Sequence, residues 1–136
     1  MKVKTGTRKI IRSERFHKVK APVSHAVRVG NLVFVSGTPP YKIGGEYREM
    51  AVGNFSEQFR QSISNMKLIL EESGSSIDRV CKVNVFLARA EDFSEMNDLY
   101  RQVFHEGDWP ARTTVVVGHV IPDMLIEIEC VAEVVD

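Results

Sequence analysis

The sequence predicts an α+β domain with one sheet and two helices, which cover one face of it. Three observations predict this class: short segments rich in β-branched residues, two segments with apolar residues at intervals of three and four, and an order that places strands first, then helix, strand, helix and two strands. The chain has 136 residues, of which 43% are hydrophobic and 26% charged. This size and composition are typical of one globular domain, so we treat residues 1–136 as a single domain.

The N-terminal segment, residues 1–20, is strongly basic. It contains eight Lys or Arg residues and one Glu, a net charge of +7 in a chain whose total charge is zero. We predict a strand at about residues 8–16, at the edge of the sheet, where lysines deter aggregation through the exposed edge. The alternative interpretation is a contact surface for RNA, because clustered basic residues bind phosphate backbones.

Residues 26–36, AVRVGNLVFVS, predict a β-hairpin. Gly30 and Asn31 lie between its two halves and are residue types that a tight turn tolerates at positive φ. The segment 37–40, GTPP, ends the second strand, because proline lacks the N–H that a central strand needs.

Residues 54–73 predict the first helix, because apolar side chains recur there at intervals of three and four and Gly74 follows at the position of a C-cap. The segment 80–87, VCKVNVFL, predicts a strand. A second helical stripe is then formed by Phe93, Met96, Tyr100, Val103 and Phe104. Each helix has one apolar stripe, which is the side that packs against the sheet.

Two further strands are predicted at residues 112–117 and 125–134. In the second strand, apolar residues alternate with Glu127, Glu129 and Glu133. Because side chains alternate between the two faces of a strand, the three glutamates share one face.

Two helices cover only one face of a sheet of this size. Residues 32–35 and 115–117 are nevertheless apolar at successive positions, which indicates that both faces of these strands avoid water. An apolar patch of this kind on a small domain usually marks a subunit interface, so we expect a homo-oligomer.

Several classes of function lack support in the sequence. It contains no Walker P-loop and no GxGxxG, paired CxxC, GxSxG or HExxH motif, and its four histidines are too scattered to suggest a metal site. No apolar run has the length of a transmembrane helix, and the N-terminus lacks the apolar core of a signal peptide. We therefore expect a cytoplasmic protein without a membrane partner, in which Cys81 and Cys130 are buried, reduced thiols.

Arg112 stands at the start of a strand rich in β-branched residues. Arginine is always charged and presents a planar fork of donors, so at the end of a largely buried strand it needs a carboxylate partner. That carboxylate belongs either to a ligand or to the protein. Glu127 or Glu129 would form an internal salt bridge if their strand pairs with the one that begins at Arg112. The pattern alone leaves both alternatives open.

Four sequence motifs occur in a characteristic order along the chain: PVSHAVRVGNLVFVSG at 22–37, NVFLARAEDFSEMNDLY at 84–100, PARTTV at 110–115 and IEIECVAEV at 126–134. Together they resemble the Rid family, the reactive intermediate deaminases once described as translation inhibitors or L-PSP endoribonucleases. The resemblance implies a chorismate-mutase-like subunit, a homotrimer, and one ligand pocket in each cleft between subunits.

The resemblance also implies a reaction. It is the hydrolysis of enamine or imine intermediates, such as 2-aminoacrylate or larger unsaturated 2-amino acids, to a 2-oxo acid and ammonia, with no metal or organic cofactor. The substrate would be a small molecule that bears a carboxylate. An RNA-binding protein or endoribonuclease, and a non-catalytic sensor of 2-oxo acids, are the alternative functions.

Four site residues follow from the resemblance. Arg112 matches the arginine that would clamp the substrate carboxylate through two parallel hydrogen bonds, and Glu127 matches the glutamate that would activate the attacking water. Gly37 would let the backbone approach the ligand closely. Asn97 matches an asparagine near the pocket, and the alternative is a solvent-facing helix residue.

Two positions depart from the best-studied deaminases of the family. Val23 stands where they have a tyrosine, and Thr114 stands where they have a cysteine. Both changes alter the lining of the substrate pocket and leave Arg112 in place. His25 lies two residues after Val23 and is a candidate replacement proton donor, although we favour a surface histidine on an early strand.

Overall fold

The computed structural model describes residues 8–135 and contains one six-stranded sheet and two α-helices. The strands follow the spatial order β1-β2-β3-β6-β4-β5. Their bounds are Arg8–Ile11 (β1), Ala26–Val29 (β2), Leu32–Thr38 (β3), Val80–Leu87 (β4), Ala111–Val116 (β5) and Ile126–Glu133 (β6). The predicted α+β class is confirmed.

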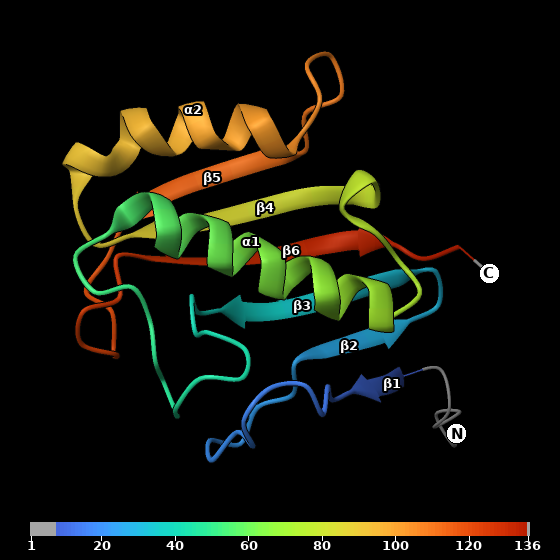
Figure 1. Cartoon of the computed structure of the whole chain (residues 1–136). Helices are drawn as coiled ribbons and strands as arrows, with labels where there is room; N and C mark the ends of the chain where they lie inside the picture. The colour runs from blue at the N-terminus through green and yellow to red at the C-terminus, as the bar shows by residue number, and fades with distance from the viewer. Residues whose placement is uncertain (1–7, 136) are drawn as a thin grey trace.

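Neighbouring strands are antiparallel except β4 and β5, which are parallel. A parallel pair needs a crossover connection, and helix α2, Phe93–Val103, supplies it. Helix α1, Phe55–Glu72, connects β3 to β4. Both helices lie on one face of the sheet, with α1 over β3 and β6 and α2 beside β5 (Figure 1).

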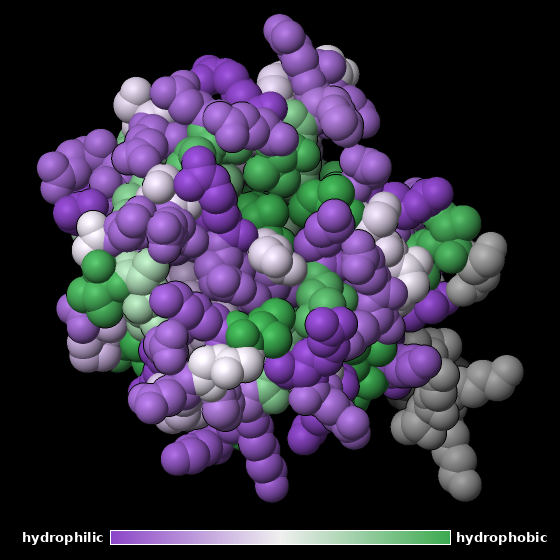
Figure 2. Space-filling view, in the orientation of Figure 1, coloured by the Kyte–Doolittle hydropathy of each residue, from purple (hydrophilic) through white to green (hydrophobic). Residues whose placement is uncertain are grey.

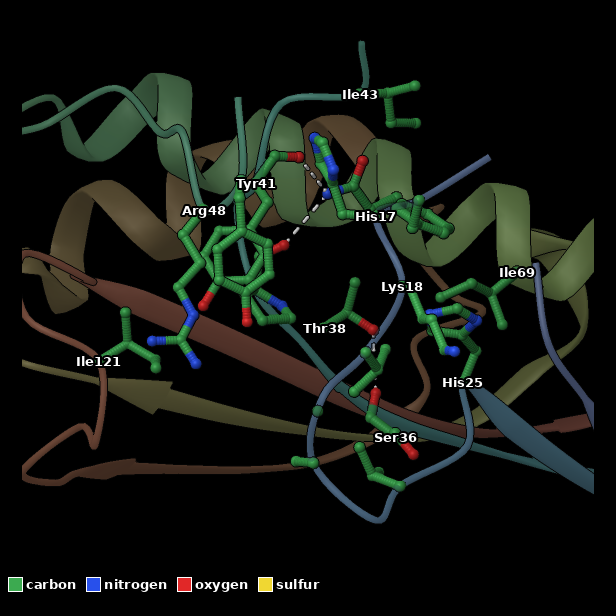
Figure 3. Close-up of a pocket in the computed structure, with 18 of the residues that line it drawn as sticks. His17, Lys18, His25, Ser36, Thr38, Tyr41, Ile43, Arg48, Ile69 and Ile121 are labelled. Atoms are coloured by element: carbon green, nitrogen blue, oxygen red, sulfur yellow. Dashed lines mark hydrogen bonds between the residues drawn. The ribbon is translucent and has the colours of Figure 1, made fainter. Parts of the chain in front are cut away.

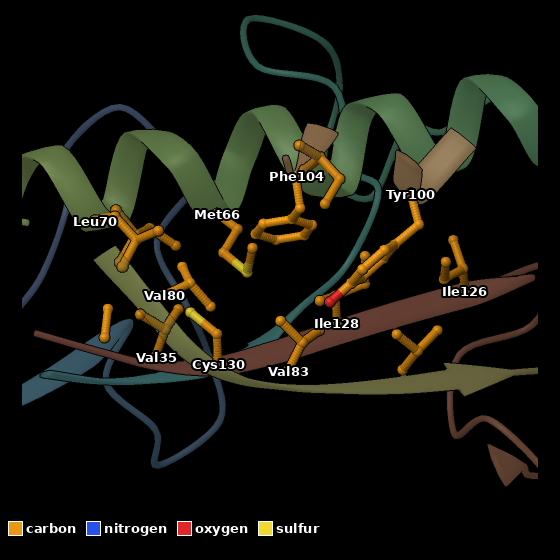
Figure 4. Packing of buried hydrophobic residues seen from close by; sticks show 14 of the residues in the cluster. Val35, Met66, Leu70, Val80, Val83, Tyr100, Phe104, Ile126, Ile128 and Cys130 are labelled. Carbon is orange, nitrogen blue, oxygen red and sulfur yellow. The ribbon is translucent and has the colours of Figure 1, made fainter. Parts of the chain in front are cut away.

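The hydrophobic core lies between the helices and this face of the sheet (Figure 4). In β6, every second side chain from Ile126 to Ala132 is at most 3% exposed, whereas Glu127 and Glu129 between them are half-buried. Met66 of α1 packs into the same cluster. The alternation confirms that the glutamates share the face that points away from the helices.

The predicted element boundaries have local causes. Gly30 has a φ of 57° in the turn between β2 and β3, and Gly74 has a φ of 85° directly after α1. Both are left-handed conformations that favour glycine. At the other end of α1, the Asn54 side chain accepts a hydrogen bond of 3.1 Å from the backbone N–H of Glu57, which caps the first turn.

The basic N-terminal strand is shorter than predicted. β1 lies at one edge of the sheet, as expected, but it ends at Ile11 rather than at residue 16. The backbone N–H of Ser13 donates to Nδ1 of His25 at 2.9 Å, so the chain leaves the strand ladder there. Residues 1–7 of the basic segment lie outside the described residues.

The two cysteines differ from each other. Cys130 is buried and free, as predicted, but Cys81 is exposed. The register between β4 and β6 shifts between Val80 and Lys82. An irregularity of this kind re-aims a side chain, which accounts for the exposed thiol in an otherwise buried strand.

In the part of the chain that the structure describes, the face of the sheet opposite the helices is partly exposed. Phe34 of β3 and Val115 of β5 are 45% and 41% exposed. β3 and β5, whose successive apolar residues predict burial on both faces with the help of a second subunit, therefore expose apolar side chains in one chain, and β5 is an edge strand. The surface seen in Figure 2 is mostly hydrophilic, with small hydrophobic patches. Within residues 8–135, no helix is long and apolar enough to span a bilayer.

Gln58 of α1 fastens two loops to the core. Its Nε2 donates to the carbonyls of Ala51 at 3.1 Å and Asp123 at 3.0 Å, and its Oε1 accepts from the N–H of Leu125 at 2.8 Å. The side chain is fully buried. This amide therefore satisfies the hydrogen bonding of three backbone groups that lie outside helices and strands.

We expect Gln58→Leu to lower the free energy of unfolding by about 2–4 kcal/mol, because buried backbone groups lose their partners while the side-chain volume is kept. Urea unfolding followed by circular dichroism measures the change. Gln102→Leu on the exposed side of α2 is the matched control and should change stability by less than about 0.5 kcal/mol. Equal stability of the two variants would contradict the expectation.

Candidate functional site

A pocket of about 310 Å³ lies at the end of β3. Residues 15–25, which precede β2, form one wall, and residues 36–48, which comprise the end of β3 and the loop after it, form another. Asn65 and Ile69 of α1 and Glu127 of β6 also line the pocket. Figure 3 shows residues of both walls around it. The two loops are joined at the rim by a 2.7 Å hydrogen bond between His17 Nε2 and the Gly45 carbonyl.

Gly37 and Glu127 are in direct contact in this pocket. A Cβ atom on residue 37 would lie 2.6 Å from Oε1 of Glu127, which is closer than real Cβ contacts occur. The register between β3 and β6 shifts between Val35 and Thr38, so a bulge brings the Gly37 backbone to the carboxylate. Glycine is needed at position 37 because it leaves space for the glutamate.

The pKa of Glu127 is raised above its ordinary value. Burial is the main cause, since it disfavours the charged form, and the negative charge of Glu129 on the same face adds to it. A carboxylate with a raised pKa is a stronger base than an exposed one. Glu127 therefore has the properties of a general base that accepts a proton from water.

Val23 and His25 also line the pocket. Val23 is 47% exposed and offers an apolar wall without a hydroxyl group. His25 is half-buried, so the interpretation of it as a surface histidine is wrong. Its Nδ1 accepts the hydrogen bond from Ser13, which places the proton of the neutral ring on Nε2, and burial lowers its pKa.

Arg112 lies on the other face of the sheet. Across the strands, Arg112 is in register with Val83 of β4 and then with Cys130 of β6, and both of those residues are buried under the helices. Its guanidinium group stacks on the ring of Tyr100 at 4.7 Å, and Nη1 is 3.8 Å from Sδ of Met96. Both contacts come from α2.

The internal salt bridge between Arg112 and a glutamate of β6 does not form. Strand β4 separates β5 from β6, and Glu127 is in register with Phe86, on the face that points away from the helices. Among residues 8–135, no carboxylate lies within ion-pairing distance of Arg112. The half-buried guanidinium therefore lacks the partner that its charge requires.

Thr114 and Asn97 belong to the same region as Arg112. Thr114 is two residues further along β5 on the same face, and its buried Oγ1 has no hydrogen-bond partner. Asn97 follows Met96 on α2 and is half-buried rather than fully solvent-facing. Arg112 and Thr114 therefore share one face of the edge strand β5, and Asn97 lies on α2 next to Met96, which contacts Arg112.

The structure thus divides the predicted site residues into two groups. Val23, Gly37 and Glu127 share the pocket, whereas Arg112, Thr114 and Asn97 lie at the β5 edge. We call these groups the Glu127 half-site and the Arg112 half-site. Within one chain, Arg112 points toward the helices and Glu127 points away from them, so neither half-site alone contains both a carboxylate clamp and a base.

Sequence reasoning named Val23, His25, Gly37 and Glu127 and missed the other residues that line the pocket, among them Tyr41 and Arg48. Both lie in residues 39–54, a long connection without helix or strand. A loop of this length is often functional, and that length was the one available signal. Within residues 8–135, no group of three or more side chains is arranged to hold a metal ion.

The fold and the two half-sites define a class: small α+β proteins with one mixed sheet, two helices on one face and a pocket at the sheet edge. Residues 14–134 match the family model described as Endoribonuclease L-PSP. The chain belongs to this family, whose members are also called RutC or Rid proteins.

Two relatives and one solved structure illustrate the match. A RutC family protein of Pyrococcus abyssi is 41% identical over 125 residues, which cover 92% of this chain and 96% of the relative. A protein of Dermatophagoides farinae named 2-iminobutanoate/2-iminopropanoate deaminase is 38% identical over 112 residues, which cover 81% of this chain and 84% of that protein. The crystal structure of yeast Mmf1 has a TM-score of 0.84 at 35% identity and covers 94% of this chain and 99% of that one.

Proposed function

We propose that the protein hydrolyses reactive 2-imino acids, formed from enamines such as 2-aminoacrylate or from larger unsaturated 2-amino acids, to 2-oxo acids and ammonia. The observation that carries this proposal is the half-buried Arg112, which has no carboxylate partner among the described residues. A 2-imino acid supplies that carboxylate. The name of the mite relative, an iminobutanoate and iminopropanoate deaminase, supports the same reaction.

The reaction needs one clamp and one base. Arg112 donates two parallel hydrogen bonds to the substrate carboxylate. Glu127 accepts a proton from water as the oxygen adds to the imine carbon, and this proton is passed to the imine nitrogen, which becomes an amine. As the C–N bond of the tetrahedral intermediate breaks, the proton of its hydroxyl group goes to the nitrogen, so ammonia leaves and the new C=O bond gives the 2-oxo acid. Water is the co-reactant, and no electron is transferred.

Both half-sites are needed, so we further propose that they meet between copies of this chain in a homotrimer. The β5 edge of one copy, with Arg112, would lie against the Glu127 pocket of the next. Two observations support this arrangement: β5 has an unpaired outer edge, and the face of the sheet opposite the helices leaves Phe34 and Val115 exposed. A heterologous contact of this type closes into a ring.

The direct test is release of ammonia and 2-oxo acid from an imine generated in the assay by an amino acid oxidase acting on 2-aminobutyrate. The protein should accelerate hydrolysis above the rate in buffer. Size-exclusion chromatography with light scattering reports the mass of the assembly. A rate equal to that of buffer alone for every 2-imino acid offered would refute the proposed activity.

The pH profile of the reaction tests the role of Glu127. Because Glu127 must be ionised to act as a base, kcat/KM should fall on the acid side, with its midpoint above the ordinary pKa of a glutamate. Removing the charge of Glu129 in Glu129→Gln should lower the pKa of Glu127 and move the midpoint to lower pH.

Glu133→Gln is the matched control for this profile. Glu133 lies on the same strand, but it is exposed and paired with Arg79 at 3.3 Å. Its substitution should leave the midpoint in place. A profile that is the same for wild type and Glu129→Gln would mean that Glu127 is not the group that titrates.

A further inference from the structure

The pocket holds more than the proposed reaction requires. Its volume of about 310 Å³ falls in the range of about 300–1,000 Å³ that suits drug-sized ligands, so a three-carbon imino acid would leave much of it empty. Several cations line the pocket as well as Glu127. Among them, Arg48 and Lys20 approach the same aromatic ring, that of Tyr47, at 5.1 and 4.7 Å.

Arg48 has no carboxylate partner among residues 8–135. Other cations of the protein do have one, such as Lys42 with Glu49 at 3.6 Å and Arg89 with Asp92 at 2.8 Å. The backbone of Arg48 has a φ of 61°, a left-handed conformation that is uncommon outside glycine and that concentrates at functional sites. The guanidinium is therefore held in place by backbone and ring contacts, with its donors unpaired.

Tyr41 lies beside Arg48 in the same pocket (Figure 3). Its backbone is fixed from within, because the buried Asn65 of α1 donates to the carbonyls of Tyr41 at 2.8 Å and Pro39 at 3.1 Å. The Tyr41 hydroxyl has no hydrogen-bond partner among the described residues. Burial raises its pKa, so at neutral pH the hydroxyl carries a proton that it can donate.

Arg48 and Glu127 bring opposite charges to the pocket that Tyr41 also lines. The charges of Arg48 and Glu127 both act on the Tyr41 hydroxyl, which lies within electrostatic reach of each. The nearest carboxylate on the Arg48 loop, that of Glu49, is held by Lys42 and by the backbone N–H of Glu46. Glu49 is therefore engaged by other groups, and the guanidinium of Arg48 is left without a carboxylate among residues 8–135.

We propose that Arg48 and Tyr41 form a second anion-binding subsite, and that the protein acts on 2-imino acids that carry a second carboxylate on the side chain. The guanidinium donates to this distal carboxylate, and the Tyr41 hydroxyl donates to its other oxygen. Arg112 from a neighbouring copy holds the first carboxylate. The substrate preference rests on the proposed deaminase function, but the subsite itself binds the 2-oxo acid product as well.

The test compares a product with and without the distal acid. Isothermal titration calorimetry measures the affinity of wild type for 2-oxoglutarate and for 2-oxobutyrate, and we expect a preference of roughly 10-fold or more for 2-oxoglutarate. Arg48→Asn removes the charge and tolerates the positive φ, and Tyr41→Phe removes the hydroxyl alone. Each should reduce the preference, and Arg48→Lys should restore part of it.

Arg60→Gln, on the exposed surface of α1, is the control and should keep the wild-type preference. The ratio of kcat/KM for the imines of glutamate and 2-aminobutyrate should follow the binding preference in every variant. Equal affinity of wild type for the two products, or a preference that survives both Arg48→Asn and Tyr41→Phe, would overturn the subsite. Absence of turnover with either imine would refute the deaminase function alone, because the binding ratio is measured without chemistry.

Discussion

Replacing Arg112 with alanine is expected to reduce kcat/KM for a 2-imino acid by roughly 100-fold or more, because two charge-assisted hydrogen bonds to the substrate carboxylate are lost. The carboxylate is bound both before and during the reaction, so much of the loss should appear as an increased KM. Arg112→Lys should retain part of the activity, since it keeps the charge but not the planar fork. Initial rates of ammonia release across a range of imine concentrations measure both parameters.

Stability measurements separate this role from a structural one. Arg112 has no ion pair to lose within the described residues, and its contacts are with the Tyr100 ring and Met96 Sδ. The melting temperature of Arg112→Ala should therefore stay close to that of wild type. Arg101→Ala, an exposed arginine of α2 that pairs with Asp98, is the matched control and should be fully active. If Arg112→Ala is also fully active, the substrate carboxylate is bound elsewhere.

Much of the fold could be predicted because local patterns dictate it. The period of two in β6 and the apolar stripe of α1 each identify an element and its buried side. Gly30 and Gly74 mark a turn and a helix end because both need positive φ. The segment 80–87 was predicted with the bounds that β4 has. In each case the residues that determine the structure are neighbours in the sequence.

The candidate site could be predicted only in part, because strand order is not a local property. The sequence does not show that β4 lies between β5 and β6, so it left open an ion pair between Arg112 and Glu127 that the sheet prevents. Residues 39–54, where Tyr41 and Arg48 lie, also show no periodic pattern of apolar residues from which their structure could be predicted. The division of the site into two half-sites follows from the register of three strands, each contributed by a distant part of the chain.

Replacing Glu127 with glutamine is expected to have opposite effects on activity and stability. Activity should fall by roughly 100-fold or more, since the amide cannot accept the proton from water. Stability at neutral pH should rise. The folded-state pKa of Glu127 is raised by burial, so its contribution to stability is fully present at low pH and is lost as the pH rises through that pKa.

Thermal unfolding as a function of pH measures this trade-off. The melting temperature of Glu127→Gln should exceed that of wild type near pH 7.5, and the difference should shrink toward about pH 4, where an ordinary glutamate becomes protonated. Glu133→Gln, which removes an exposed carboxylate, should show no such pH-dependent gain. A Glu127→Gln variant that is less stable than wild type at pH 7.5 would mean that the carboxylate has a favourable partner in the assembly.

Mixing the two inactive variants tests where the half-sites meet. If each active site combines Arg112 of one copy with Glu127 of its neighbour, then a mixed assembly of Arg112→Ala and Glu127→Gln chains contains some clefts in which both residues are intact. Random assembly into closed rings from equal amounts should restore about a quarter of the wild-type activity. If both residues act within one chain, no mixture contains an intact site, and the activity stays at the level of the separate variants. The two variants are unfolded and refolded together, so that their chains exchange and form mixed assemblies. The activity of the mixture then distinguishes a site shared between two chains from a site within one chain.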